Sequence, residues 1–284
     1  MITELNQLEF DKVKHLTDSC RNIEVRAVVS GWNPGRVYVD DATNITAALI
    51  WIQGHSGFQL IGDAKSIPFR NELHGWMKKH IEPELLHLHM QSVEIGVSDG
   101  GWEGVIEHMS GSRELAGDIQ HVFIPSSVNG WINTISQPAC SSPYSPQYEN
   151  VRVLSIEETL LEEKKLNQLS FLKDKISHFW TTAEDFLKYG FGYIAVHNDD
   201  IASVCLSAFV ADEMHAIDIE TIEVYRKRNY GALVVQAYAE ECKSRGVHPY
   251  WDCSPSNTGS IRLAKSIGLS LDFRYKVYWY DLIK

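Results

Sequence analysis

The sequence predicts an α/β (α+β) fold divided into two α/β domains, and three observations support this prediction. Apolar residues make up 44% and charged residues 22% of the 284 residues, as in a globular protein with a sizeable core. Strand-like and helix-like segments alternate along the chain. A stretch rich in proline and serine, residues 137–147, contains three prolines, which neither a helix nor a strand accommodates. We therefore expect domains at 1–136 and 148–284, joined by this linker.

The C-terminal half carries the clearer pattern. Two sequences of the form Ser/Thr-x-x-Glu predict helix starts, at 155–158 and 181–184. Strand-like segments occur at 151–154, 193–196, 202–210, 215–224, 249–253 and 273–280, and further helices are predicted at 230–245 and 260–267. The resulting order, β, α, α, β, β, β, α, β, α, β, predicts a central mixed sheet covered by helices.

The segment 215–224 and the helix after it are the most regular part of this pattern. Ile217 and Ile219 alternate with Asp218 and Glu220, so the two pairs are expected on opposite faces of a strand. The helix over 230–245 has a mostly apolar face at spacings of three and four residues, and Gly246 is a typical helix end.

The N-terminal half repeats this arrangement in a weaker form. Three strand-like segments in close succession are followed by a helix and two more strands, at residues 35–39, 46–52, 58–61, 71–89, 92–97 and 121–124. We interpret this half as a smaller, degenerate copy of the C-terminal half. The alternative is that two unrelated α/β domains resemble each other by chance.

Charge and cysteine content exclude several classes of protein. Lys and Arg total 26 and Asp and Glu total 37, a net charge of −11, which argues against nucleic-acid binding and favours cationic partners. Residues 1–16 lack the pattern of a signal peptide, and the longest near-apolar run, 45–52, is too short to cross a membrane. The five cysteines are scattered without a C-x-x-C pair, so a reducing cytoplasm is the expected location.

The stretch from Val224 to Ala232 is the most informative for function, because it links the alternating strand to the long helix. Asn229 and Gly231 tolerate a positive φ, which lets successive backbone N–H groups point to one place. Such N–H groups, together with the positive end of a helix, bind phosphate oxygens. The sequence therefore predicts a diphosphate-binding loop that consists of Arg226, Lys227, Arg228, Asn229, Tyr230, Gly231 and Ala232.

This loop, Arg226-x-x-Asn229-x-Gly231, resembles the acyl-CoA loop of the GNAT superfamily of N-acetyltransferases, Arg/Gln-x-x-Gly-x-Gly/Ala, with asparagine in place of the first glycine. A second family pattern is matched downstream by Asn257, Ser260 and Gly268, while Ala264 replaces the family's usual tyrosine. The resemblance implies a C-terminal GNAT acyl-CoA N-acyltransferase fold, preceded by a degenerate GNAT-like domain.

A narrower resemblance is to the subfamily that includes the zwittermicin A resistance acetyltransferase. It is carried by His215-x-Ile-Asp-Ile-Glu-Thr, by Trp251-Asp252-Cys253 and by Asn257, and more weakly by segments around residues 37–41 and 46–51. The family implies acetyl-CoA as co-substrate and an amine as acceptor, but the identity of the acceptor does not carry over to this chain. We expect a small amine-bearing acceptor and, from the residues themselves, no metal.

The resemblance also implies site roles. Glu220 stands where many members place the general base, with Asp218 as the second candidate and Tyr278 as a substitute acid. The strand edge at Ile222, Glu223 and Val224 would pair with the pantetheine arm, and Asn257 and Ser260 would complete the coenzyme site. His215, Asp252 and Cys253 are the candidate acceptor-binding residues.

Several alternatives remain open at this point. Ala264 and Asn229 are compatible with a module that senses acetyl-CoA without catalysis, and a purely structural protein would bind no CoA. Cys253 has no partner histidine that the sequence identifies, and a metal at His80 and His87 lacks a carboxylate ligand. The N-terminal half has no such loop after residues 58–61, so we expect one acyl-CoA site per chain.

Overall fold

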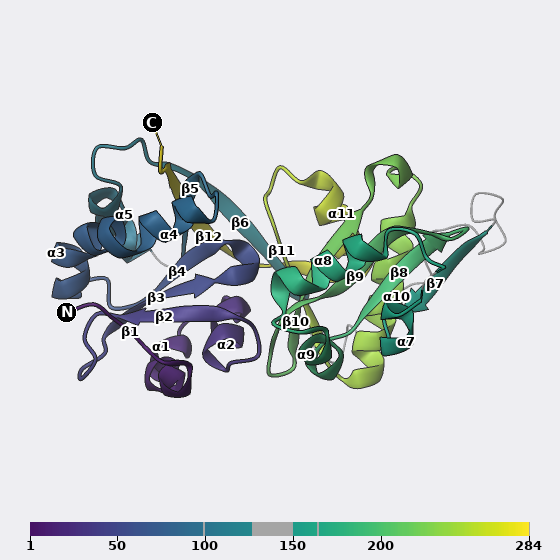
Figure 1. The fold of residues 1–284 in the computed structure, drawn as a ribbon, viewed down its shortest axis with the longest axis horizontal. Helices are drawn as coiled ribbons and strands as arrows, with labels where there is room; N and C mark the ends of the chain where they lie inside the picture. Colours follow the sequence, from purple (N-terminus) through teal and green to yellow (C-terminus); the bar gives the residue numbers. More distant parts are fainter. Residues whose placement is uncertain (99, 127–149, 164, 284) are drawn as a thin grey trace. The chain divides into compact units, whose positions relative to one another are not determined.

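The structure is a computed structural model that describes residues 1–98, 100–126, 150–163 and 165–283 (Figure 1). The chain forms two compact units: Met1–Gln120 with Arg274–Lys284, and His121–Phe273. The predicted linker at 137–147 lies outside the described residues. No helix in the described ranges is long and apolar enough to cross a membrane.

The first unit contains a mixed sheet in the order β1-β2-β3-β4-β5-β12. The strands are β1 (Thr3–Glu4), β2 (Gly35–Val39), β3 (Ala47–Ile52), β4 (Gly57–Gly62), β5 (Ser92–Val97) and β12 (Leu269–Asp281). Strands β2, β3 and β4 are antiparallel, whereas β4 and β5 are parallel. Most residues of β3 are buried, as expected for a strand that helices cover on both faces.

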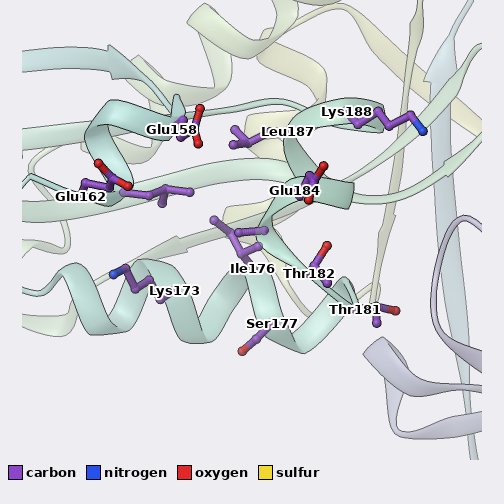
Figure 2. Close-up of a pocket in the computed structure, with 12 residues that line it drawn as sticks. Glu158, Glu162, Lys173, Ile176, Ser177, Thr181, Thr182, Glu184, Leu187 and Lys188 are labelled. Atoms are coloured by element: carbon purple, nitrogen blue, oxygen red, sulfur yellow. The ribbon is translucent and has the colours of Figure 1, made fainter.

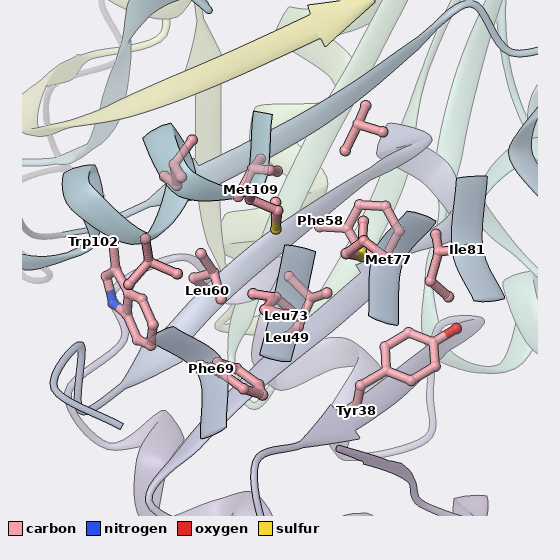
Figure 3. Close-up of a cluster of buried hydrophobic side chains, with 14 of the residues drawn as sticks. Tyr38, Leu49, Phe58, Leu60, Phe69, Leu73, Met77, Ile81, Trp102 and Met109 are labelled. Atoms are coloured by element: carbon pink, nitrogen blue, oxygen red, sulfur yellow. The ribbon is translucent and has the colours of Figure 1, made fainter. Parts of the chain in front are cut away.

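Helices cover both faces of this sheet (Figure 1). On one side lie α3 (Ile67–Trp76), α4 (Glu82–His87) and α5 (Glu103–Ser110), and on the other α1 (Lys14–Thr17) and α2 (Ile23–Val29). Between the sheet and α3, α4 and α5 is a core in which Leu49 and Leu60 meet Phe69 and Trp102 (Figure 3). The predicted single helix over 71–89 is interrupted by a π-helical turn at Met77–Ile81, because Pro83 has no N–H for the regular helical hydrogen bond.

The second unit contains a sheet in the order β6-β11-β10-β9-β8-β7. Its strands are β6 (Ala116–Pro125), β7 (Val151–Ser155), β8 (Gly192–His197), β9 (Asp200–Ala211), β10 (Met214–Thr221) and β11 (His248–Cys253). Strands β10 and β11 are parallel, and the other neighbours are antiparallel. Its helices are α7 (Glu158–Leu161), α8 (Leu169–Phe179), α9 (Ala183–Tyr189), α10 (Tyr230–Arg245) and α11 (Thr258–Ser266).

Helices α8 and α10 contact opposite faces of β10. Ile217 and Ile219 pack against the core that α10 forms, whereas Asp218 and Glu220 face Lys175 of α8. The predicted alternation is therefore confirmed for residues 217–220. The strand ends at Thr221 rather than at 224, because Glu223–Tyr225 forms a 3-10 turn.

The boundary between the units falls inside β6 and inside β12. Residues 276–281 of β12 pair with β5 in the first unit, while residues 121–123 of β6 pair with β11 in the second. The sheet of each unit thus includes a strand segment from the opposite half of the sequence. Both units contain a parallel strand pair joined through helices, β4–β5 and β10–β11, as a repeated architecture requires.

Candidate functional site

The loop between β10 and α10 adopts an unusual backbone. Lys227 and Asn229 both have left-handed dihedrals, with φ of 63° and 62°. The positive φ predicted for Asn229 is confirmed, but Gly231 lies inside the helix with an ordinary φ. An added Cβ at Gly231 would lie 3.3 Å from Thr221 Oγ1, a close contact that leaves little room for a side chain. The left-handed Lys227 could not be predicted, because lysine rarely adopts this conformation.

The first turn of α10 has the properties of an anion site. Asn229 occupies the N-cap position, but its side chain makes no capping hydrogen bond. The first N–H groups of a 16-residue helix therefore lack a side-chain cap and carry the positive end of the helix dipole. By contrast, Thr182 caps α9 by accepting a hydrogen bond from the Asp185 N–H at 3.0 Å.

A cavity of about 800 Å³ lies beside this helix start, between the end of β10, the loop and α11. The predicted coenzyme residues that line it are Arg226, Lys227, Asn229, Tyr230, Gly231, Ala232, Asn257 and Ser260. Glu220 also lines it, and Arg262 of α11 adds a basic side chain that the sequence did not indicate. Three cationic side chains and an uncapped helix N-terminus together favour a phosphorylated ligand.

Strands β10 and β11 separate next to this cavity. They pair only through Met214–Ala216 and His248–Tyr250, and the register of β10 against β9 shifts at the same point, between Ala216 and Ile217. Beyond it, Ile217–Thr221 has no ladder partner on the β11 side among the residues that the structure describes, so its backbone groups there can pair with an extended ligand. The predicted edge at Ile222, Glu223 and Val224 is thus displaced to Ile217–Thr221, because the strand ends before residue 222.

Asp218 and Glu220 share the ammonium group of Lys175. Lys175 Nζ lies 3.1 Å from Asp218 Oδ2 and 2.7 Å from Glu220 Oε2. Burial disfavours the charge of Lys175, but attraction to Asp218 and hydrogen bonds to both carboxylates outweigh it and raise the pKa of Lys175. Glu220 is 39% exposed and lines the cavity, whereas Asp218 is 22% exposed and does not. The geometry therefore makes Glu220 the more accessible proton acceptor.

The structure places His215 in the core rather than on a cavity wall. Its Nδ1 lies 3.0 Å from Ser207 Oγ, and its ring is next to Phe191. Burial, with a smaller effect from the charge of Arg245, lowers the pKa of His215 to about 4. His215 is therefore neutral near pH 7 and belongs to a buried hydrogen-bond network.

This depressed pKa predicts a pH-dependent stability. Between about pH 6.5 and 4 the unfolded chain takes up a proton at His215, whereas the folded chain does not. The contribution of neutral His215 to the free energy of unfolding is therefore full above this window and declines as the pH falls through it. Replacing His215→Asn should destabilise the protein less at pH 5 than at pH 7, by about 2 kcal/mol. Urea unfolding of both proteins at the two pH values measures this difference, and an equal effect at both would contradict it.

The remaining predicted residues have structural contacts. Asn257 Oδ1 accepts the Ser260 N–H at 3.0 Å and caps α11, and Ser260 Oγ accepts the Trp251 Nε1–H at 2.7 Å. Asp252 and Cys253 lie on β11, and burial raises the pKa of the Cys253 thiol, which makes it a poor nucleophile. Tyr278 belongs to the first unit, where its hydroxyl donates to Glu103 Oε1 at 3.2 Å.

A larger cavity, of about 930 Å³, lies between α7, α8 and α9 (Figure 2). Ile176 and Leu187 point into it, and Glu158, Glu162 and Glu184 contribute carboxylates. It contains none of the predicted site residues. Two helices begin beside it: α9, which Thr182 caps, and the four-residue α7, whose first residue, Glu158, adds a carboxylate that disfavours phosphate. Size alone therefore does not identify the functional site.

In the first unit, the helix that corresponds to α10 is α3, which follows β4 as α10 follows β10, and its start has a different environment. Helix α3 begins at Ile67-Pro68, and Ser66 Oγ donates to the buried Asp40 Oδ2 at 2.7 Å. Burial favours the neutral form of Asp40, but hydrogen bonds from Thr46 and Ser66 outweigh it and lower the pKa of this carboxyl. A carboxylate next to this helix start disfavours phosphate, and the proline removes one donor. No group of three or more potential metal ligands occurs among the residues that the structure describes.

The separated parallel strands, the left-handed loop and the uncapped helix are features that suit an extended, phosphorylated ligand. The chain matches the model of the family described as GNAT acetyltransferase over residues 14–278, and it belongs to this family. It is thus an N-acetyltransferase, and the family implies acetyl-CoA as the donor.

Individual relatives agree with this assignment. The protein described as uncharacterized N-acetyltransferase YdfB of Bacillus subtilis (strain 168) is 24% identical over 293 residues, which cover 98% of each chain. A GCN5-related N-acetyltransferase-like protein from Streptococcus suis 89/1591 has a similar fold, with a TM-score of 0.65, 18% identity and coverage of 96% of this chain and 98% of that one. A tandem GNAT protein from the clavulanic acid biosynthesis pathway has a TM-score of 0.58 at 10% identity, with 100% and 99% coverage. The predicted fold, a GNAT domain preceded by a GNAT-like domain, is confirmed.

Proposed function

We propose that the protein transfers the acetyl group of acetyl-CoA to a primary amine of a small, cationic molecule by direct attack of the amine on the thioester. The observation that carries this proposal is the cavity that Glu220 and the loop Arg226–Ala232 line together, with Arg228 alone of the loop residues outside the lining. The same space thus contains groups that attract phosphate and a carboxylate that can accept a proton.

The residues of the second unit would have distinct roles in this reaction. Glu220 accepts a proton from the acceptor's ammonium group, which frees the nitrogen lone pair for attack. A backbone N–H on the unpaired edge Ile217–Thr221 donates a hydrogen bond to the thioester oxygen as negative charge develops there. The new amide bond forms as the carbon–sulfur bond breaks, and CoA leaves as the thiolate. Ala264 cannot protonate it, so solvent is the simplest proton source.

The negative charge of the protein and of its candidate site supports a cationic acceptor. The chain has a net charge of −11, and Lys175 offsets only one of the two charges of Asp218 and Glu220. The narrower resemblance to the zwittermicin A resistance acetyltransferase makes a toxic amine one candidate, and a cytoplasmic location remains part of this proposal. Release of CoA thiol from acetyl-CoA, measured against a panel of amines, tests the proposed acceptor class. Turnover confined to neutral or acidic amines would contradict it.

We expect one coenzyme site per chain. Helix α3 of the first unit also starts without a side-chain cap, but Pro68 removes one of its N–H donors and the Asp40 carboxylate lies beside it, whereas α10 has neither feature. Calorimetric titration with CoA should give a stoichiometry close to one. Two equivalent sites would contradict the assignment of CoA to the loop of the second unit alone.

A further inference from the structure

Two tyrosines flank the diphosphate loop and attach it to the turn between β8 and β9. The Tyr225 hydroxyl donates a hydrogen bond to Asp200 Oδ2, at the start of β9. The Tyr230 hydroxyl lies 2.9 Å from Nδ1 of His197, the last residue of β8, and the two rings stack with centroids 5.9 Å apart. Both ends of the loop are thus held by one hairpin.

The loop needs such attachment because its backbone is strained. Between the tyrosines lie only residues 226–229, and two of these four, Lys227 and Asn229, are left-handed. A left-handed lysine is unfavourable in free energy and persists only where the surrounding structure fixes it. Holding both ends of a short segment removes many of the competing conformations.

Asp200 is itself held from a second side. Asn167 Nδ2 donates to Asp200 Oδ1 at 2.6 Å, while Tyr225 uses the other carboxylate oxygen. The backbone of Asn167 is fixed too, since its N–H donates to Asp199 O at 2.8 Å and its carbonyl accepts the Ile201 N–H at 3.3 Å. Asp200 does not line the cavity, whereas Tyr225 does, so any effect of Asp200 on a ligand there that depends on contact passes through Tyr225.

We propose that Asp200 is a positioning residue for the coenzyme diphosphate, which acts by fixing Tyr225 and with it the left-handed geometry of the loop. This inference rests on the proposed function of the loop as the CoA site. For removal of the Asp200 carboxylate, it predicts a change in CoA affinity of the opposite sign to the change that electrostatics alone predicts. Removing a negative charge near a diphosphate should strengthen binding by Coulomb's law, whereas losing a positioning contact should weaken it.

The test compares Asp200→Ala with Asp199→Ala. Asp199 is the neighbouring carboxylate on the same turn, its side chain is 70% exposed, and its ion-pair partner, Arg152 at 3.9 Å, lies on β7 and not in the loop. Calorimetry should show CoA binding about tenfold weaker for Asp200→Ala and equal or slightly tighter binding for Asp199→Ala. Acetyl-pantetheine, which lacks the diphosphate, should bind Asp200→Ala and the wild type equally.

Two more conservative substitutions test the same contact with less risk of misfolding. Tyr225→Phe removes only the hydroxyl that Asp200 accepts and should also weaken CoA binding. Tyr193→Phe removes a hydroxyl from the same hairpin, which donates to Glu241 Oε2 at 3.1 Å on α10, and should leave CoA binding unchanged.

The outcomes are distinguishable. A wild type that binds no CoA would overturn both the proposed function and this inference. A wild type that binds CoA, with Asp200→Ala and Tyr225→Phe binding it equally or more tightly, would overturn the inference alone. A weakening that is equal for CoA and acetyl-pantetheine would also overturn it, because the effect would not pass through the diphosphate.

Discussion

Replacing Asn229 with proline is expected to weaken CoA binding by about a hundredfold or more. Asn229 has a φ of 62°, whereas proline fixes φ near −65°, so the loop cannot keep its conformation. Proline also restricts the residue before it, Arg228, within the same loop. The N–H groups at the start of α10 and the side chains of Arg226 and Lys227 would then no longer point to one place. Calorimetry with CoA measures the loss directly.

The matched control is Asn229→Gly. Glycine adopts a positive φ without strain and restores the residue that the family usually has here. Asn229 is exposed, so neither substitution removes core packing. Asn229→Gly should unfold near the wild-type temperature, whereas Asn229→Pro should unfold at a lower temperature because its φ does not fit the native loop. We expect Asn229→Gly to bind CoA at least as tightly as the wild type. Wild-type affinity in Asn229→Pro would exclude the loop as the coenzyme site.

Replacing Glu220 with glutamine is expected to lower kcat by a factor on the order of 100 to 1,000. Glutamine keeps the size of the side chain and can still accept a hydrogen bond from Lys175, but it cannot take up the proton of the acceptor's ammonium group. The affinity for CoA should stay close to that of the wild type, since the phosphate-binding groups are unchanged. Steady-state thiol release at saturating acetyl-CoA and amine gives kcat.

Two further variants isolate the role of Glu220. Glu223→Gln removes an exposed carboxylate from the adjacent 3-10 turn and should leave kcat unchanged. Asp218→Asn removes the second partner of Lys175, and because Asp218 does not line the cavity we expect a smaller loss than for Glu220→Gln. A large loss in Asp218→Asn combined with normal turnover in Glu220→Gln would assign the base to Asp218 instead.

The local features of the site could be predicted from the sequence. The alternation of Ile217 and Ile219 with Asp218 and Glu220 identified both faces of β10, and the pattern over 230–245 identified α10 and its end at Gly246. The positive φ of Asn229 followed from its residue type and its place between a strand and a helix. These features depend on neighbouring residues, which periodicity and residue preferences describe well.

The features that depend on distant residues could not be predicted. Nothing in residues 217–221 indicates that β10 separates from β11, because the alternation stays regular while the pairing ends. In the sequence, Lys175 looks like any charged residue on a helix surface. Its position opposite Asp218 and Glu220 depends on how α8 packs on the sheet. Asp200 lies 25 residues before Tyr225, and no local pattern connects them. Such contacts are set by tertiary packing rather than by local preference.

Each half of the sequence contributes a strand segment to the sheet of the other unit. Residues 121–123, from the N-terminal half of the sequence, pair with Trp251–Cys253 of β11, the strand that parts from β10 at the cavity. Without them this edge of β11 would expose unpaired backbone groups. Deleting the N-terminal half of the sequence would therefore remove a strand that the sheet beside the cavity needs, so the two halves are not separable modules.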